Sequence, residues 1–281
     1  MLRFFKNVRY VLSENPLSLM AAVLLFVVVL TAIVGPYLVP YDPYASNTDS
    51  MYQAPGYAHW FGTDQLGRDI FSRVVVATRL DLWIALVAVA FSFAVGSSIG
   101  GISGFVGGRV DRVIGRFVDV LMAFPLFVLA MALVAALGNK VENIILATAI
   151  INLPFYIRLS RAEVNLLRNL TYVDAARVSG NSKLDILFRI LLPNALPSLM
   201  VQLSVNFGWA ILNAAGLSFI GLGVRPPTAE WGIMVSDGAK DIISGYWWTG
   251  LFPGLALTLT VFCFNILGDS LRDLADPRKR S

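Results

Sequence analysis

Residues 17–39 read LSLMAAVLLFVVVLTAIVGPYLV, an apolar run without one charged side chain. A helix needs ~20 such residues to cross the hydrocarbon core of a bilayer. Arg3, Lys6 and Arg9 precede the run, as basic residues precede a secretory signal. The run exceeds the ~7–15 apolar residues of a signal, however, and no A-x-A-like cleavage site closes it. The sequence therefore predicts a retained membrane-spanning helix.

Five further apolar runs follow, so the chain is expected to be an all-α membrane protein with six transmembrane helices. Of its 281 residues 57% are hydrophobic and 14% are charged, against about 25% charged residues in soluble domains. In the fourth run Pro154 leaves a re-entrant loop as an alternative to a full span, and Pro125 and Pro154 are expected to mark kinks. The expected segments are residues 17–39, 82–105, 118–138, 142–159, 198–222 and 249–269.

Lys and Arg are unevenly distributed between the connecting segments. With the N-terminus placed in the cytoplasm, the large majority of the 22 basic residues fall on the cytoplasmic side. The positive-inside rule then predicts that the N and C termini are both cytoplasmic. The basic residues left outside are Arg68, Arg73, Arg79, Lys140, Arg225 and Lys240.

Several kinds of chemistry are absent from the sequence. It contains no phosphate-binding G-x-x-x-x-G-K-[ST] motif, no G-x-S-x-G nucleophile motif and no zinc signature. Cys263 and His59 are the only residues of their types, which excludes a cysteine-cluster metal site. The basic residues lie between apolar runs and form no stripe that would suit nucleic acid. We therefore expect no catalytic residue, no metal, no cofactor and no nucleic acid partner.

The interiors of the six segments carry no Asp, Glu, Lys, Arg or His, and Asp119 and Asp269 lie at segment ends. Carriers driven by ions or protons usually need buried ionisable groups for coupling. A transport protein powered by a partner is therefore favoured, with a secondary carrier not driven by ATP as the alternative. A membrane-bound hydrolase is disfavoured by the single His and the missing nucleophile motif.

Three side-chain patterns suggest roles within the membrane: a polar row, a row of glycines and a group of aromatic residues. Gln202, Asn206, Trp209 and Asn213 fall at i, i+4, i+7 and i+11, which is one face of a helix. They either line a polar translocation path or hydrogen-bond to neighbouring helices. A row of glycines on the second helix is expected to allow close packing within the chain or against a partner subunit: Gly96, Gly100, Gly104 and Gly108. Four aromatic residues are expected to form an interfacial belt: Trp231, Tyr246, Trp247 and Trp248.

Residues 171–194, TYVDAARVSGNSKLDILFRILLPN, are a polar interruption between the fourth and fifth apolar segments. Gly180 suits the position after a short helix at 172–179, where a left-handed conformation costs Gly nothing. Asn181 or Ser182 can cap a second helix, and Ser182 with Asp185 resembles a capping box. Pro193 and Pro197 are expected to end this helix. The second helix has an apolar face of Leu184, Leu187, Phe188 and Leu191. Such a unit suits either insertion into a groove on a soluble protein or a position on the bilayer surface.

The same stretch resembles the E-A-A-x-x-x-G-x(9)-I-x-L-P motif of the membrane subunits of bacterial ABC importers. In that family the loop is a coupling helix that docks on the ATP-hydrolysing subunit. The resemblance implies the same role here, with Asp in place of the leading Glu. The matching residues are Asp174, Ala175, Ala176, Gly180, Ile190, Leu192 and Pro193.

Four more stretches resemble the second, C-type permease subunit of dipeptide, oligopeptide and nickel importers: HWFGTDQLGRDIFSRVVVATR, GGRVDRVIGRFVDVLMAFP, LSFIGLGVRPPTAEWGIMVSDGA and GDSLRDLADPRKR. Ala77 and Asp81 stand where Gly and Ser are expected. The resemblance implies a type I ABC importer permease in the bacterial inner membrane. Residues 1–81 would hold the first transmembrane helix and a long periplasmic loop. Residues 82–281 would form the core permease domain, with five transmembrane helices and the coupling loop 171–194.

The resemblance also implies partners and a range of substrates. The expected partners are a homologous permease in a heterodimer, two ATP-binding subunits, a periplasmic substrate-binding protein and the lipid bilayer. The outer loops, residues 40–81 and 223–248, are expected to meet the binding protein or to shape the outer gate. Dipeptides, longer peptides, glutathione-like compounds, opines and nickel all remain open as substrates.

Overall fold

The computed structural model describes residues 16–275, and within them the chain forms helices and no named strand. The five longest helices are α2 (Pro16–Val34), α3 (Ile70–Val106), α6 (Val141–Leu167), α9 (Leu192–Phe219) and α11 (Trp248–Ala275). The predicted all-α membrane class is confirmed. The terminal basic residues behind the predicted orientation, such as Arg3 and Arg280, lie outside the described residues.

Shorter helices connect these five. They are α4 (Gly108–Met122), α5 (Leu126–Leu137), α7 (Thr171–Val178), α8 (Lys183–Asp185) and α10 (Trp231–Asp241). One π-helical turn (Ile186–Leu191) and three 3₁₀ turns (Gly35–Tyr37, Thr48–Ser50 and Ile242–Ser244) complete the described elements. Five helical stretches are long and apolar enough to cross a membrane, and α4 with α5 would make a sixth span if counted together.

The third predicted segment, residues 118–138, is not one helix. The axes of α4 and α5 differ by 87°, and the break falls immediately before Pro125. Proline lacks a backbone N–H and disfavours helical geometry in the preceding residue, so α4 ends and α5 begins anew. The re-entrant alternative for the fourth segment is wrong, because α6 runs through Pro154 as a single helix of 27 residues.

The second predicted segment begins earlier than expected. Asp69 caps α3, since its carboxylate accepts a hydrogen bond from the N–H of Ser72 at 2.7 Å. The helix therefore starts at Ile70 and extends over 37 residues. At 1.5 Å per residue this is about 55 Å, longer than the ~30 Å hydrocarbon core. A single helix thus extends between the two ends of the molecule.

The glycine row brings α3 against α6. A Cβ on Gly96 would lie 2.7 Å from Cβ of Tyr156, and one on Gly104 would lie 2.5 Å from the carbonyl oxygen of Arg161. A Cβ on Gly100 would overlap the backbone of Ile157. The packing prediction is therefore confirmed for these three glycines. Gly108 follows the end of α3 and has no atom of the described residues within 4 Å of its Cβ position, so it takes no part in this contact.

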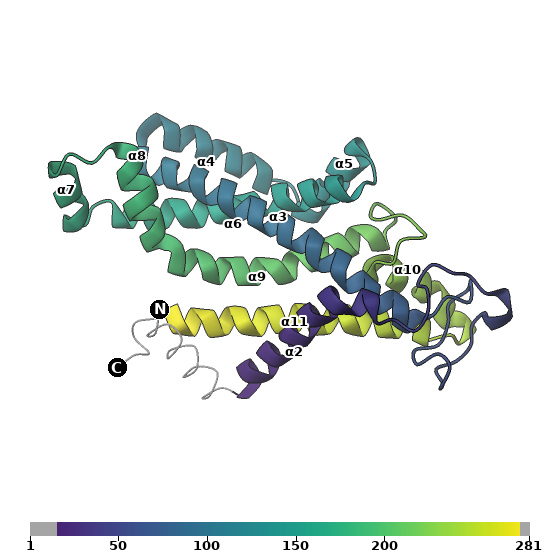
Figure 1. Cartoon of the computed structure of the whole chain (residues 1–281). Coiled ribbons are helices and arrows are strands. Elements are labelled where there is room, and N and C mark those ends of the chain that lie inside the picture. Colours follow the sequence, from purple (N-terminus) through teal and green to yellow (C-terminus); the bar gives the residue numbers. More distant parts are fainter. Residues whose placement is uncertain (1–15, 276–281) are drawn as a thin grey trace.

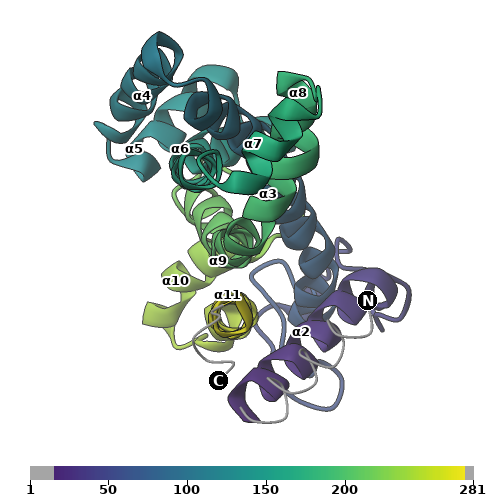
Figure 2. The ribbon, with the colours of Figure 1, turned by 90° about the vertical axis from the view of Figure 1, so that its left-hand side faces the viewer.

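The arrangement has two ends and two edges. Figure 1 shows α3, α6, α9 and α11 along the long dimension of the molecule, with α7 and α8 at one end and α10 with the long N-terminal loop at the other. Seen at right angles, α4 and α5 lie at one edge and α2 at the opposite edge (Figure 2). The polar segment 171–194 therefore protrudes from one end of a helical bundle.

The predicted aromatic belt is wrong for two of its tryptophans. The side chain of Trp231 is 1% exposed, and its indole N–H donates to the carbonyl of Val74 at 3.1 Å. Trp248 is also buried and donates to the carbonyl of Thr63 at 3.2 Å. Both rings pack in an apolar core at the end that carries α10. Indole rings that reach backbone acceptors serve this core rather than a membrane interface.

Candidate functional site

The segment of residues 171–194, here called the arm, connects α6 to α9. Its first helix, α7, ends at Gly180, whose φ is +80°. The N–H of Gly180 donates to the carbonyl of Arg177 at 3.1 Å, and the N–H of Asn181 donates to the carbonyl of Ala176 at 3.2 Å. These two bonds form a Schellman motif. The predicted left-handed glycine is confirmed, and it sets the direction in which the chain leaves α7.

The second helix of the arm starts as predicted. The hydroxyl of Ser182 accepts from the N–H of Asp185 at 3.1 Å and donates to its carboxylate at 2.5 Å. The prediction that this helix ends near Pro193 and Pro197 is wrong, because helical backbone continues from Lys183 to Phe219. The physical reason lies in the π-turn just before Pro193.

In this π-turn the N–H of Leu192 donates to the carbonyl of Leu187, five residues back. An ordinary α-turn would press the Pro193 ring against the carbonyl four residues before it. The wider turn relieves that contact. The side-chain amide of Asn194 supplies an additional donor, to the carbonyl of Ile190 at 2.7 Å. The arm and α9 thus form one continuous helical piece.

The base of the arm is fixed and its tip is apolar. Val173 is fully buried in a cluster with Val164, Ile186, Leu187 and Leu191. Around the tip, Val178 is 90% exposed and Leu184 is 68% exposed, and Phe188 is also exposed. The predicted apolar face of the second helix is therefore divided between buried and exposed residues. Leu187 and Leu191 are buried and anchor the arm, whereas Leu184 and Phe188 are exposed. Exposed apolar side chains gathered on a fixed projection are typical of a protein interaction surface.

The residues of the motif occupy both parts of the arm. Asp174 is exposed and pairs with Arg177 at 2.8 Å. An exposed pair of this kind contributes little to stability, so the Asp174 carboxylate is accessible to a partner. Ala175, Gly180 and Pro193 are exposed, and Ala176, Ile190 and Leu192 are half-buried.

The polar row on α9 does not form one continuous wall. The amide of Gln202 donates to Asn206 at 2.9 Å, and that of Asn213 donates back to the carbonyl of Trp209 at 2.8 Å. Asn206 is 2% exposed, whereas Trp209 is 56% exposed. The four residues therefore form two separate pairs, Gln202 with Asn206 and Trp209 with Asn213. Asn206 faces the protein interior, while Trp209 is accessible from outside the chain.

The two loops that were predicted to lie outside, residues 40–81 and 223–248, form one unit at the end opposite the arm, here called the outer unit. The hydroxyl of Tyr52 donates to the carboxylate of Asp241 at 2.8 Å, and its ring stacks on Tyr246. Burial and the bond to Asp241 raise the pKa of Tyr52 to about 12. Together with the bonds from Trp231 and Trp248, these contacts join the predicted loops 40–81 and 223–248.

A buried carboxylate pair under these loops was not predicted. Asp81, assigned to the loop, lies within α3 and accepts from the N–H of Trp231 at 3.1 Å. Glu230 has no exposed surface and accepts from the N–H groups of Gly232 and Ile233 at 2.9 and 2.8 Å. Burial raises the pKa of Glu230. A Glu before a helix start signals a cap, but the interaction of Glu230 with the side chain of Asp81, 149 positions earlier, has no local signal.

We expect Glu230→Ala to destabilise the outer unit more than Glu230→Gln. Alanine leaves two buried N–H groups without acceptors, at a cost of about 1–3 kcal/mol each. Glutamine keeps one acceptor oxygen. It is also neutral, which costs less at this site because burial disfavours a charged carboxylate and so raises the pKa of Glu230. Thermal unfolding of the detergent-purified assembly would measure both. Equal melting temperatures for the two variants would contradict the capping role.

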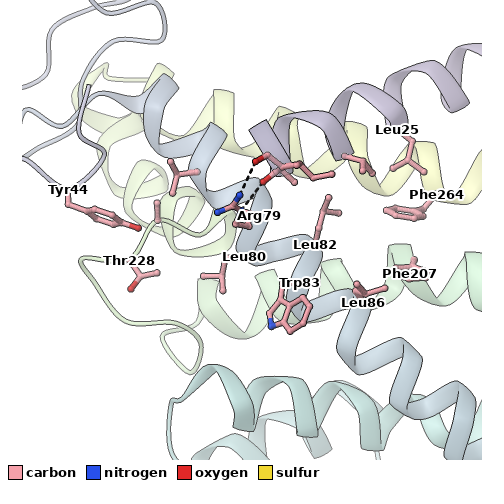
Figure 3. A pocket seen from close by; sticks show the side chains of 15 residues that line it. Leu25, Tyr44, Arg79, Leu80, Leu82, Trp83, Leu86, Phe207, Thr228 and Phe264 are labelled. Carbon is pink, nitrogen blue, oxygen red and sulfur yellow. Dashed lines mark hydrogen bonds between the residues drawn. The ribbon is translucent and has the colours of Figure 1, made fainter. Parts of the chain in front are cut away.

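A hollow of about 840 Å³ opens between α2, α3, α9 and α11. Figure 3 shows its apolar lining, which includes Trp83 and Phe207. Arg79 is the charged residue of the lining, and its guanidinium donates to the carbonyls of Ala32 and Ile33 at 2.9 Å each. Two of the five N–H donors of this guanidinium are thus engaged, and most of the remaining lining of the hollow offers apolar contact.

Comparison with known proteins gives two family matches. Residues 96–281 match the family described as "Binding-protein-dependent transport system inner membrane component". Residues 3–55 match the "N-terminal TM domain of oligopeptide transport permease C". The two matches together include both the arm and the first apolar segment.

Curated relatives are similar over nearly the full length. The probable D,D-dipeptide transport system permease protein DdpC of Escherichia coli (strain K12) is 44% identical, over 96% of this chain and 90% of its own. The glutathione transport system permease protein GsiD of Pectobacterium atrosepticum is 42% identical, over 92% and 86%. The di/tripeptide transport system permease protein DppC of Pseudomonas aeruginosa is 40% identical, over 96% and 90%.

Proposed function

Because the chain belongs to the family of binding-protein-dependent transport system inner membrane components, we propose that it carries peptides across the membrane in step with ATP hydrolysis by partner subunits. It is a multi-pass inner membrane protein and a permease subunit of an ABC importer. The proposal concerns how this subunit is coupled, what it moves and how it is oriented.

The arm is the coupling element in this proposal. The observation that carries it is the fixed, apolar-tipped projection between α6 and α9, with Val173 buried and Val178 exposed. Asp174, Ala175, Ala176 and Gly180 would lie against the ATP-binding subunit. Ile190, Leu192 and Pro193 would connect that contact to α9. Since α9 packs against α3, α6 and α11, a displacement of the arm would reach most of the bundle.

The assembly would contain a homologous permease, two ATP-binding subunits and a periplasmic binding protein. The sequence of the chain contains no phosphate-binding loop, so ATP hydrolysis would take place in the partners and this subunit would be non-catalytic. The core permease domain would be residues 82–281, although α3 crosses its predicted boundary at residue 81. Gln202, Asn206, Trp209 and Asn213 would contribute one side of the translocation path.

Peptides are the proposed substrate class because the relatives carry names that specify D,D-dipeptides, di- and tripeptides and, in one group, the tripeptide-like glutathione. Uptake of labelled dipeptides into proteoliposomes that contain the full assembly would test this. Uptake should require ATP inside the vesicles and the loaded binding protein outside. Uptake driven by an ion gradient without ATP would instead favour a secondary carrier.

Cysteine labelling would test the proposed orientation. Cys263 is buried and would be replaced by Ala first. In a strain without the ATP-binding subunits, Tyr57→Cys should react with an impermeant thiol reagent on intact cells, and Val178→Cys only after permeabilisation. Both side chains are at least 90% exposed, so accessibility is matched. Labelling of position 178 on intact cells would reverse the orientation.

A further inference from the structure

A second hollow, here called the basic hollow, lies between α4 and α6 at one edge of the bundle (Figure 2). Its volume is about 320 Å³. Arginines outnumber carboxylates in its lining, so the hollow carries a net positive charge. The charged residues that line it are Asp111, Arg112, Arg116, Asp119, Arg158 and Arg161.

Both aspartates of the basic hollow are already engaged by arginines of α6. Asp111 pairs with Arg161 through two hydrogen bonds, one of them at 2.7 Å, and also accepts from the hydroxyl of Ser103 at 2.6 Å. Asp119 pairs with Arg158 at 3.0 Å. These contacts fix α4 against α6, and they leave the excess positive charge on the two arginines of α4.

Arg112 and Arg116 carry this uncompensated charge. They are four positions apart on α4, so their side chains lie on the same face of the helix. Both are exposed, and neither side chain has a hydrogen-bond or ion-pair partner among residues 16–272. Two free guanidinium groups at one hollow suit an anion with several acceptor oxygens, such as a phosphate, because each can form paired, charge-assisted hydrogen bonds with it.

The surface of α4 beside these arginines is apolar. Val113, Phe117 and Val120 are all exposed. Arg116 is three positions after Val113 and four before Val120, so it is their direct neighbour on the helix surface. Basic and apolar side chains next to one another on an exposed helix surface are typical of a helix at the bilayer interface, where headgroups and acyl chains meet.

The expected limits of the apolar runs place the basic hollow near the cytoplasmic surface of the bilayer. The third run begins at residue 118 and the fourth ends at residue 159, so Arg112, Arg116 and Arg161 lie outside both, within about two helical turns. The cytoplasmic leaflet contains anionic lipids, whereas the cytoplasmic segments of a neighbouring permease are expected to be rich in Lys and Arg. A lipid phosphate therefore complements the charge of the hollow better than a second permease does.

We propose that the basic hollow binds the headgroup phosphate of an anionic phospholipid of the inner leaflet, with Arg112 and Arg116 as its ligands. The acyl chains of this lipid would lie along Val113, Phe117 and Val120. The ion pairs of the two aspartates with α6 would keep α4 in place without neutralising the two ligands. The proposal rests on the proposed orientation and does not depend on the transported substrate.

Titration of the delipidated, detergent-purified full assembly with phosphatidylglycerol would test this, with thermal unfolding as the readout. A ligand that binds the folded state raises the melting temperature in a saturable way. Phosphatidylglycerol should do so, and phosphatidylcholine, which has no net charge, should not. Arg112→Gln and Arg116→Gln should each weaken the apparent affinity for phosphatidylglycerol about tenfold, the loss expected for a charge-assisted contact.

Arg109→Gln is the matched control, because Arg109 lies on the same helix, is exposed and does not line the basic hollow. It removes the same charge and should leave the affinity nearly unchanged. A loss of affinity in the two hollow variants alone supports the site. Equal affinities in all three variants overturn it, because diffuse attraction to a basic surface would then explain the binding, and so does a native assembly that phosphatidylglycerol does not stabilise.

Further measurements on the same proteins separate other roles of the two arginines. Inorganic phosphate is the soluble comparison, and equal stabilisation by phosphate at the same concentration would identify a site for a free anion and overturn the lipid site. Co-purification of the second permease and the melting temperature without lipid should be unchanged in the hollow variants. A loss of either would show that the arginines serve a subunit interface or the fold, and the lipid proposal would fail.

Discussion

Gly180→Val is expected to abolish ATP-driven uptake while the subunit remains in the membrane at near-native levels. Gly180 has a φ of +80° and open space around its Cβ position, so the cost is conformational rather than steric. The left-handed region costs a residue with a side chain about 1–2 kcal/mol, and a β-branched residue is especially unsuited to it. The turn would relax toward another geometry and change the direction of the chain between α7 and α8.

Gly245→Val is the matched control for this prediction. Gly245 has a φ of +89°, equally open space, and a position in the outer loops. It carries the same strain without touching the arm. Immunoblots, co-purification of the ATP-binding subunits and uptake would be measured for both variants. Normal uptake by an assembled Gly180→Val complex would show that the turn plays no part in coupling, and loss of the subunit itself would indicate a purely structural turn.

Gly100→Val should remove most of the folded subunit. A Cβ on Gly100 would overlap the carbonyl oxygen of Ile157 and lie 2.9 Å from its Cα. The obstacle is backbone, so α3 and α6 would have to separate, and theirs is the most extensive contact between the helices of residues 16–275. Overpacking typically costs 1–3 kcal/mol, and separation of the two helices would also loosen the close contacts at Gly96 and Gly104.

Gly254→Ala provides the comparison for a milder Gly100→Ala variant. Gly254 is also inside a long helix, but its nearest neighbour would be 3.8 Å away, at a methyl of Val235. Alanine there should be neutral or stabilising by up to about 1 kcal/mol. Detergent-resistant monodisperse protein, measured by fluorescence-detected size exclusion, should fall for Gly100→Ala and stay level for Gly254→Ala. Equal yields would contradict close backbone packing as the function of the glycine row.

Local signals in the sequence predicted local structure well. The end of α7 at Gly180 and the start of α8 at Ser182 both depend on bonds between residues at most five positions apart, and both are confirmed. The length of each apolar run also predicted the membrane-spanning segments well, because this length is a property of one helix and not of its contacts. The apolar character of residues 17–39 needed no tertiary contact to be interpreted.

Predictions failed where a backbone adjustment or a distant partner decided the outcome. Pro193 was expected to end a helix, but a π-turn accommodates it. Pro125 was expected to kink one helix. The chain instead forms two helices, α4 and α5, whose axes differ by 87°. Trp231 was expected at a lipid interface, although its acceptor, the carbonyl of Val74, is 157 residues away.

The site was predicted in the same uneven way. The motif located the arm in the sequence, because all of its residues lie within one short stretch. The ion pair between Asp111 and Arg161 was missed, since these residues are 50 positions apart and meet only when α4 folds back against α6. The α9 row was found by periodicity, yet periodicity alone does not distinguish the buried amide of Asn206 from the exposed ring of Trp209.

The π-turn sets the direction in which the arm leaves the continuous helix from Lys183 to Phe219. A π-turn holds about one more residue than an α-turn, so it offsets the arm by about 100° about the helix axis relative to an uninterrupted α-helix. Because Pro193 disfavours an α-turn at this place, a single proline in the sequence determines the side of α9 toward which the exposed tip of the arm is turned.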